Sequence, residues 1–260
     1  MQVYWLEQTE EDVPAEGDWL SARELAQLSA MRFAKRRVDW QLGRWTAKHA
    51  FAACFCLPDD RFLLAKIELR PASSGAPEVF FANKPAPANI SLSHREGVAV
   101  CAVALEGGAL GCDLEMIETR SDAFLRDYFT IEEQAMVAQT PEDDRPRLLA
   151  LLWSAKESAL KALHVGLRLD TRSVNVLPPM LGRPRFRSEN ECIEQVASGE
   201  QPTESLDPWL RLHVRCPHGQ LFHGWWKQTG RFVQTVLATE LAFPPTQLTP
   251  STRPAMPVPS

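Results

Sequence analysis

The sequence predicts an α+β protein made of two similar halves, each with helices packed against a small, mainly antiparallel sheet. Each half contains a helix start marked by a capping signature, and each continues into short apolar segments separated by turn residues. The order of these elements is the same in both halves, which hints at internal duplication and a pseudo-dimeric arrangement, although no repeat of residue identities is evident. Hydrophobic residues make up 45% of the chain, enough for a core in each half.

The first half is taken as residues 1–108. Val3–Leu6 is an expected strand, and Ser21 and Glu24 form a capping box in which the serine accepts from the backbone and the glutamate reaches back. Further on, the sequence predicts a helix over 37–56 that ends before a proline, a strand over 61–70 and a loop rich in proline and glycine over 71–89.

A hairpin is expected where the halves meet. Val98–Leu105 is a continuous apolar run of strand length, and Glu106, Gly107 and Gly108 provide a turn signal. The returning strand is expected over 109–115.

The second half is taken as residues 109–243. Thr130 and Glu133 form another capping box, and a helical periodicity follows Pro146. The remaining elements are a predicted three-stranded meander over 209–216, 220–227 and 231–239 and a tail over 244–260 that has too little apolar content to pack and is expected to be disordered.

Composition and charge exclude several classes of protein. The formal net charge is −5 and no long basic tract exists, which argues against duplex nucleic acid as a partner. No run of 18 apolar residues predicts a membrane span, and the N-terminus lacks the features of a secretory signal. The six cysteines form no C-x-x-C pair and are expected to be reduced thiols. A cytoplasmic location is therefore expected.

Two acids stand close together in the segment GCDLE. Asp113 and Glu115 are at i and i+2, so on a strand both carboxylates point to one face and Leu114 points to the other. Adjacent acids repel each other unless a cation lies between them. Mg²⁺ takes a few carboxylates and fills its other positions with water and phosphates. Considered alone, the pair is also explained by a strand end whose acids face solvent.

A second motif, WSAKESALK, lies on the predicted helix. Trp153, Glu157 and Lys161 recur every four residues and share one helix face. Considered alone, Glu157 and Lys161 are also explained as a surface ion pair worth ~0.3–0.5 kcal/mol. A neighbouring apolar stripe that would seat the helix in the core consists of Leu148, Leu152, Ala155 and Ala159.

A third motif, NISLSH, precedes the apolar run from Val98. Its Ser93 and His94 are suitable phosphate ligands, by hydrogen bonding and by charge. A lone histidine in such a segment is also explained as a loop residue without a role.

Together and in this order, the three motifs resemble those of the phosphopantetheinyl transferases of the larger monomeric type. That family shows an S-H motif, then G-x-D-x-E, then W-x-x-K-E-[SA]-x-x-K roughly forty residues later. Arg37–Lys48 resembles the family's N-terminal helix. Asn83, Lys84 and Pro85 resemble its G-K-P loop, with Asn83 in place of the usual glycine. The resemblance covers about residues 30–180.

The resemblance implies Mg²⁺-dependent transfer of 4′-phosphopantetheine from coenzyme A to a serine of an apo acyl or peptidyl carrier protein, with 3′,5′-ADP as by-product. It implies that Asp113, Glu115 and Glu157 hold the Mg²⁺. Glu157 is the expected general base, with a water on the metal as the open alternative. Lys161 and His94 are expected to bind the pyrophosphate and to stabilise the leaving group.

Coenzyme A is expected to contact residues of both halves. The nucleotide end, with its 3′-phosphate, is assigned to the basic residues Arg37, Arg44, Lys48 and Lys84. The other expected contacts are Pro85, Ser93, His94 and Lys161.

The carrier protein is expected to contact residues 120–129, because arginine and aromatic side chains are common interface anchors. Packing of a short helix explains that segment almost equally well. The resemblance also implies a monomer. Two other functions are open alternatives: a different Mg²⁺-dependent phosphodiester or pyrophosphate enzyme, and a non-catalytic binder of carrier proteins.

A zinc site is disfavoured near the C-terminus. Its candidate ligands are His213, Cys216, His218 and His223. Because polar residues alternate with apolar ones from Leu210 to Arg215, the segment is better interpreted as a strand with one polar face.

Overall fold

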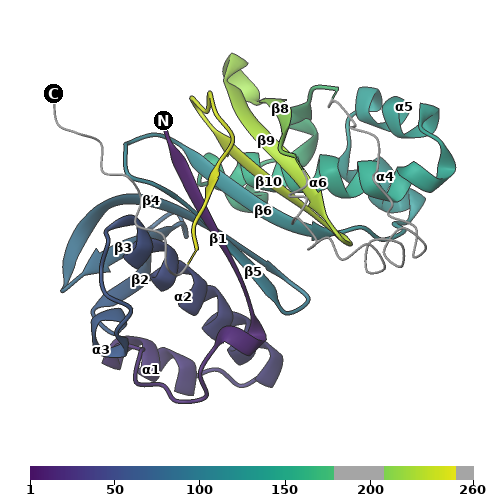
Figure 1. The fold of residues 1–260 in the computed structure, drawn as a ribbon. Helices are drawn as coiled ribbons and strands as arrows, with labels where there is room; N and C mark the ends of the chain where they lie inside the picture. Colours follow the sequence, from purple (N-terminus) through teal and green to yellow (C-terminus); the bar gives the residue numbers. More distant parts are fainter. Residues whose placement is uncertain (179–207, 250–260) are drawn as a thin grey trace, which may run out of the picture.

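The computed structural model describes residues 1–178 and 208–249, which form two α+β halves (Figure 1). The first half contains helices α1 (Ala22–Ser29), α2 (Ala34–Cys54) and α3 (Arg61–Leu64) and strands β1 (Val3–Thr9), β2 (Ile67–Pro71), β3 (Pro77–Phe81), β4 (Lys84–Arg95) and β5 (Val98–Ala104). The second half contains helices α4 (Asp122–Tyr128), α5 (Ile131–Gln139) and α6 (Arg145–Ala162) and strands β6 (Leu110–Met116), β7 (Asn175–Val176), β8 (Leu210–Arg215), β9 (Leu221–Thr229) and β10 (Phe232–Ala238).

Five strands of each sheet follow the same order. The first runs β1-β5-β4-β3-β2 and the second runs β6-β10-β9-β8-β7, and the pairings within each series are antiparallel. Helix α2 packs on the first sheet and α6 on the second (Figure 1). The predicted α+β class with two similar halves is therefore confirmed.

A buried ion pair occurs at equivalent places in both halves. Lys48 Nζ lies 2.6 Å from Glu24 Oε2, and Lys156 Nζ lies 2.8 Å from Glu133 Oε2, with all four side chains at most 1% exposed. Each glutamate also closes the predicted capping box of its helix. Each carboxylate therefore serves two purposes, since it caps one helix and neutralises a lysine of the next.

The ion pairs show a sequence repeat that was not evident from the sequence alone. Lys48 ends the segment WTAK and Lys156 ends the segment WSAK, and these segments occupy matching positions on α2 and α6. The expectation of no repeat in residue identities was therefore wrong. The repeat spans only four residues, so it is recognised only when the two helices are compared at matching positions in the fold.

Three hydrophobic cores hold the molecule together. One lies between α2 and the first sheet, and another between α6 and the second sheet. The third joins the two halves, because it draws apolar side chains from strands of both sheets, among them Val3, Val100, Leu110 and Val236. Burial of this third core fixes the halves against each other, so residues of both can form one site.

Two predicted elements of the first half differ from the structure, whereas the meander of the second half does not. Residues 61–64 are helical rather than a strand, because the Asp60 side chain accepts a hydrogen bond from Leu63 N and caps the turn. The predicted loop 71–89 contains β3 and the start of β4, where a register shift between Glu78 and Phe80 accommodates a proline-containing strand. The predicted meander is confirmed as β8, β9 and β10.

The expected hairpin between the halves is also wrong. β5 pairs with β1 and β4, so both its edges are occupied, and β6 instead pairs with β10 in the other sheet. The turn at 106–108 therefore carries the chain from one sheet to the next.

The tail is ordered at its beginning. Within residues 244–249, β11 (Thr246–Gln247) pairs in parallel with β1, which corrects the expected disorder for this stretch. Residues 250–260 lie outside the described residues. None of the described helices combines the length and the apolar character that crossing a bilayer requires.

Candidate active site

The acidic strand β6 packs against α6. Gly111, Asp113 and Glu115 alternate along β6. A Cβ at Gly111 would lie 1.8 Å from the Ser158 carbonyl oxygen, so only glycine lets α6 approach this closely. The close approach brings Glu157 and Lys161 of α6 to the acids of β6.

Asp113 is the meeting point of the three motifs. Its Oδ1 accepts hydrogen bonds from Lys161 Nζ at 2.8 Å and from Ser93 Oγ at 2.8 Å. The residues come from α6, from β4 of the other half and from β6. The second carboxylate oxygen, Oδ2, is buried and has no hydrogen-bond partner among the described residues. A buried acceptor without a donor is costly, and a cation would satisfy it.

Glu115 belongs to a charged chain that also crosses between the halves. Arg120 Nη2 lies 3.3 Å from Glu115 Oε2 and 2.8 Å from Glu118 Oε1, which Arg95 Nη2 of β4 reaches at 2.9 Å. Burial, followed by the charge of Asp113, raises the pKa of Glu115 to about 7, although Arg95 and Arg120 oppose the shift. Burial and the neighbouring carboxylate thus favour the protonated form of Glu115, whereas a bound cation would favour its ionised form.

Glu157 is electrostatically coupled to the same acids. Burial first, and Asp113 second, raise the pKa of Glu157, while Lys161 opposes the shift. Burial alone would lower the pKa of Lys161, but Asp113 and further negative groups raise it, so the lysine stays charged. Among the described residues, no three His, Cys, Asp or Glu side chains already lie close enough to enclose a metal ion. Nevertheless, carboxylate oxygens, raised acid pKa values and the unsatisfied Asp113 Oδ2 are the features that a hard divalent cation would match.

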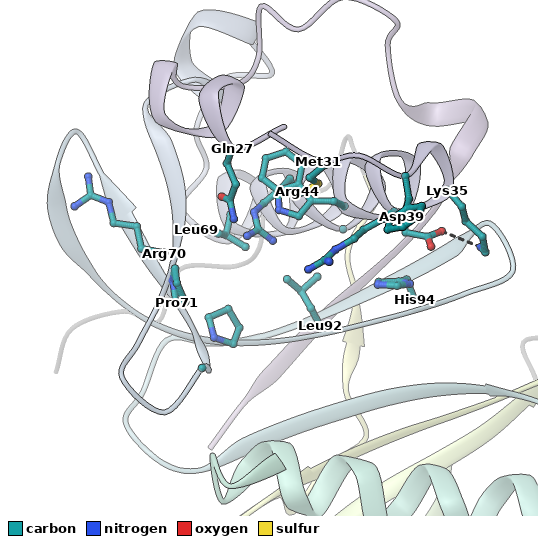
Figure 2. A pocket seen from close by; sticks show the side chains of 16 residues that line it. Gln27, Met31, Lys35, Asp39, Arg44, Leu69, Arg70, Pro71, Leu92 and His94 are labelled. Atoms are coloured by element: carbon teal, nitrogen blue, oxygen red, sulfur yellow. Dashed lines mark hydrogen bonds and ion pairs between the residues drawn. The ribbon is translucent and has the colours of Figure 1, made fainter. Parts of the chain in front are cut away.

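A basic pocket of about 800 Å³ opens beside His94 (Figure 2). In Figure 2, Arg44 and Asp39 of α2 lie across it from Leu92 and His94 of β4. The basic side chains that line it are Lys35, Arg36, Arg44, Arg70 and His94.

His94 links this pocket with the acids. Its side chain is exposed at the pocket, yet enough protein surrounds the ring that desolvation lowers its pKa. The ring is influenced both by Asp39 in the pocket and by Lys161 and Asp113 at the acidic strand. A ligand in the pocket could therefore extend past His94 to the acids.

Arg44 has a guanidinium group with a hydrogen-bond donor that the described residues leave unused, which suits an anion. Its guanidinium carbon lies 4.7 Å from the centre of the Trp40 ring, and its Nε has no hydrogen-bond partner among the described residues. Desolvation lowers the pKa of Arg44, with Glu24 opposing the shift. An incoming phosphate would supply the acceptor that this buried donor lacks.

Lys48 does not reach the pocket, which corrects its predicted contact with the nucleotide. Its ammonium is fully buried and donates to Glu24 and to the carbonyl oxygens of Trp19 and Leu64. All three ammonium hydrogens are thereby used. Lys48 is therefore a structural residue in this protein.

Three further predicted contacts lie outside the pocket lining. Arg37 is exposed and donates from Nη1 to the Met31 carbonyl oxygen at 3.1 Å. Lys84 and Pro85 begin β4 after a turn, and Pro85 lines a different cavity of about 300 Å³. The turn still touches the pocket indirectly, because Asn83 Oδ1 accepts from Arg70 Nη2 at 2.7 Å.

Lys35, Arg36 and Arg70 also line the pocket, although none of them was a predicted site residue. The helix was expected from 37, whereas α2 begins at Ala34. With the earlier start, Arg36, Trp40 and Arg44 fall at successive four-residue intervals on one face, the signal that would have found this basic surface.

The two arginines of the segment expected to contact a carrier protein, residues 120–129, have different surroundings. Arg120 is held by Glu115 and Glu118, as described above, and lies 5.1 Å from the Phe124 ring. Arg126, by contrast, is 68% exposed on α4. Of the two arginines, only Arg126 is available to a partner without breaking the charged chain.

The chain is similar to known proteins in part of its sequence and in part of its fold. Residues 109–205 match the family model of the 4′-phosphopantetheinyl transferase superfamily. Among solved structures, the chain is similar to the holo-[acyl-carrier-protein] synthase (AcpS) of Thermotoga maritima, with 25% identity, 48% of this chain and 72% of that chain covered, and a TM-score of 0.32. No curated protein matches. The matched region begins just before the acidic strand and includes α6 with Glu157 and Lys161.

Proposed function

We propose that this protein is a phosphopantetheinyl transferase that moves 4′-phosphopantetheine from coenzyme A to a serine of an apo acyl or peptidyl carrier protein, with Mg²⁺, and releases 3′,5′-ADP. One observation carries the proposal. Asp113 Oδ1 accepts from both Lys161 and Ser93, so groups from three separate segments converge on one carboxylate beside a basic pocket.

The pocket accounts for the nucleotide end of coenzyme A. Its arginines and Lys35 suit the 3′-phosphate, and Trp40 offers an aromatic surface beside Arg44. His94 lies between this pocket and the acids, where the pyrophosphate would have to pass. The pocket therefore supports a substrate with a nucleotide at one end and a reacting pyrophosphate at the other.

Asp113, Glu115 and Glu157 would hold the Mg²⁺, which neutralises pyrophosphate charge when bound. The serine Oγ attacks the phosphorus that bears the pantetheine arm, and the bond from that phosphorus to the 3′,5′-ADP oxygen breaks. In this proposal Glu157 is also the general base and takes the serine proton. Lys161 and His94 stabilise the charge that develops on the leaving oxygen.

The test is to incubate the protein with apo carrier proteins of fatty acid, polyketide and nonribosomal peptide type, coenzyme A and Mg²⁺, and to weigh the carriers by mass spectrometry. The expected result is one added phosphopantetheine on a serine and an equal amount of 3′,5′-ADP. Absence of the adduct on every carrier, with a known transferase active in parallel, would overturn the proposal.

A variant tests the base separately. Glu157→Gln is expected to lower kcat by about 10²–10⁴, the range for loss of a general base. Glu142→Gln, in the short acidic turn before α6, serves as a charge-matched control and should leave kcat unchanged. Full activity of Glu157→Gln would exclude Glu157 as the base and leave the overall reaction standing.

A further inference from the structure

Two histidines face each other on the second sheet, away from the acids and the basic pocket. His213 of β8 and His223 of β9 are direct partners in the antiparallel register. Their Nδ1 atoms lie 3.2 Å apart, and their ring planes are 88° from parallel. Both side chains are half-buried, so the pair is held by the sheet and still reached by solvent.

The separation of the two nitrogens fits a shared metal ion. A divalent ion bound to imidazole nitrogen at about 2.0–2.1 Å places two such ligands about 2.9–3.4 Å apart, for ligand angles between square and tetrahedral. The observed 3.2 Å lies within this range. The two Nδ1 atoms share a hydrogen bond, so a metal ion would replace the proton between them at nearly the same nitrogen separation.

Metal ions bind neutral imidazole, and the surroundings of His213 favour this form. Burial, together with the charges of His223 and Arg211, lowers the pKa of His213. Arg211 itself is engaged elsewhere, since its guanidinium lies 4.2 Å from the Trp225 ring and donates to the Ala242 carbonyl oxygen.

We propose that His213 and His223 form a binding site for a late first-row divalent transition ion, with water at the other coordination positions. Imidazole is a preferred ligand of Cu²⁺, Ni²⁺ and Zn²⁺, and affinity for such a site should be greatest for Cu²⁺. Mg²⁺, which prefers oxygen, should not bind here. Among the described residues no third His, Cys, Asp or Glu joins the pair, and the fuller set with Cys216 and His218 is not assembled.

The test uses the full-length protein with its carboxylates saturated by Mg²⁺. Titration with Cu²⁺, followed by calorimetry, should show one site whose Cu²⁺ affinity falls at least about tenfold in His213→Asn and in His223→Asn. Loss of a residue that only supports a metal ligand already lowers metal affinity by about 10–100-fold. His218→Asn is the matched control, because His218 is exposed in the turn between the same two strands. The Cu²⁺ affinity of this variant should equal that of the unsubstituted protein.

A measurement on the unsubstituted protein does not depend on the variants folding. The electron paramagnetic resonance spectrum of the protein with one equivalent of Cu²⁺ should show coupling to two imidazole nitrogens. A spectrum with one nitrogen or none, or unchanged Cu²⁺ affinity in a folded His213→Asn variant, would overturn the proposal. Zn²⁺ should compete with the bound Cu²⁺, whereas excess Mg²⁺ should not.

Discussion

Lys161 Nζ lies 2.8 Å from Asp113 Oδ1, and the same oxygen accepts a hydrogen bond from Ser93 across the boundary between the two halves. The lysine also donates to the Cys112 carbonyl oxygen at 3.1 Å. These contacts hold one oxygen of Asp113 within protein and leave Oδ2 as the oxygen without a partner among the described residues. Lys161 therefore sets which carboxylate oxygen can meet a cation.

Loss of this lysine should impair the reaction more than the fold. Lys161→Met removes a charge beside the reacting pyrophosphate and frees Asp113 to rotate, so kcat should fall by about 10²–10³. Initial rates with coenzyme A and a carrier protein measure the effect, and Lys66→Met, an exposed lysine of the first half, is the control. Unaltered kcat in Lys161→Met would contradict its role.

The stability of the metal-free protein should depend on pH through Glu115. Because its pKa is about 7 in the folded protein and 4.5 ordinarily, the folded state binds the extra proton. The resulting stabilisation is present below about pH 4.5 and is lost as the pH rises through 7, by at most about 3 kcal/mol. Urea unfolding with a chelator at pH 5 and pH 8 should therefore show a smaller difference in Glu115→Gln than in the unsubstituted protein. Equal differences in the two proteins would refute this origin of the pH dependence.

Gly111 should tolerate no side chain. In Gly111→Ala the new methyl group would lie 1.8 Å from the Ser158 carbonyl oxygen, so β6 and α6 must move apart, at a cost of about 3 kcal/mol or more in unfolding free energy. Gly107→Ala is the control, since nothing lies within 4 Å of a Cβ there. Thermal unfolding compares the two variants, and an equal small effect in both would show that the helix can shift without cost.

The site's acids could be predicted from the sequence because strand and helix periodicities are local. Asp113 with Glu115, and Glu157 with Lys161, each follow from spacing within one element. The contact of Ser93 with Asp113 could not be predicted, since it depends on packing between two sheets. The buried pairing of Lys48 with Glu24 was missed for the same reason, because a lysine in a basic helix looks solvated until the neighbouring helix supplies its carboxylate.

Substitution of Lys48 should affect the stability of the fold, whereas substitution of Arg36 should affect the binding of coenzyme A. Lys48→Met leaves Glu24 as a buried carboxylate without its counter-charge. The substitution should therefore lower the free energy of unfolding by about 3–5 kcal/mol and leave the KM for coenzyme A unchanged. Arg36→Met, at the exposed pocket, should leave stability unchanged and raise that KM about tenfold, equivalent to about 1.4 kcal/mol. Urea unfolding and steady-state rates give both quantities. A stable Lys48→Met variant with a raised KM would restore the lysine to the nucleotide site.

Arg126 and Arg120 should affect different steps, although they lie on the same segment. Arg126→Glu reverses an exposed charge on α4 and should raise the KM for an acidic carrier protein about five- to tenfold, with kcat unchanged. Arg120→Gln breaks the contact with Glu115 and should instead change kcat and its dependence on Mg²⁺ concentration. Rates measured over a grid of carrier and Mg²⁺ concentrations distinguish the two effects, with Lys66→Glu, at an exposed lysine of the first half, as control. If Arg126→Glu left the KM unchanged, α4 would not be a carrier contact. If Arg120→Gln changed only the KM, its ion pair with Glu115 would be irrelevant to catalysis.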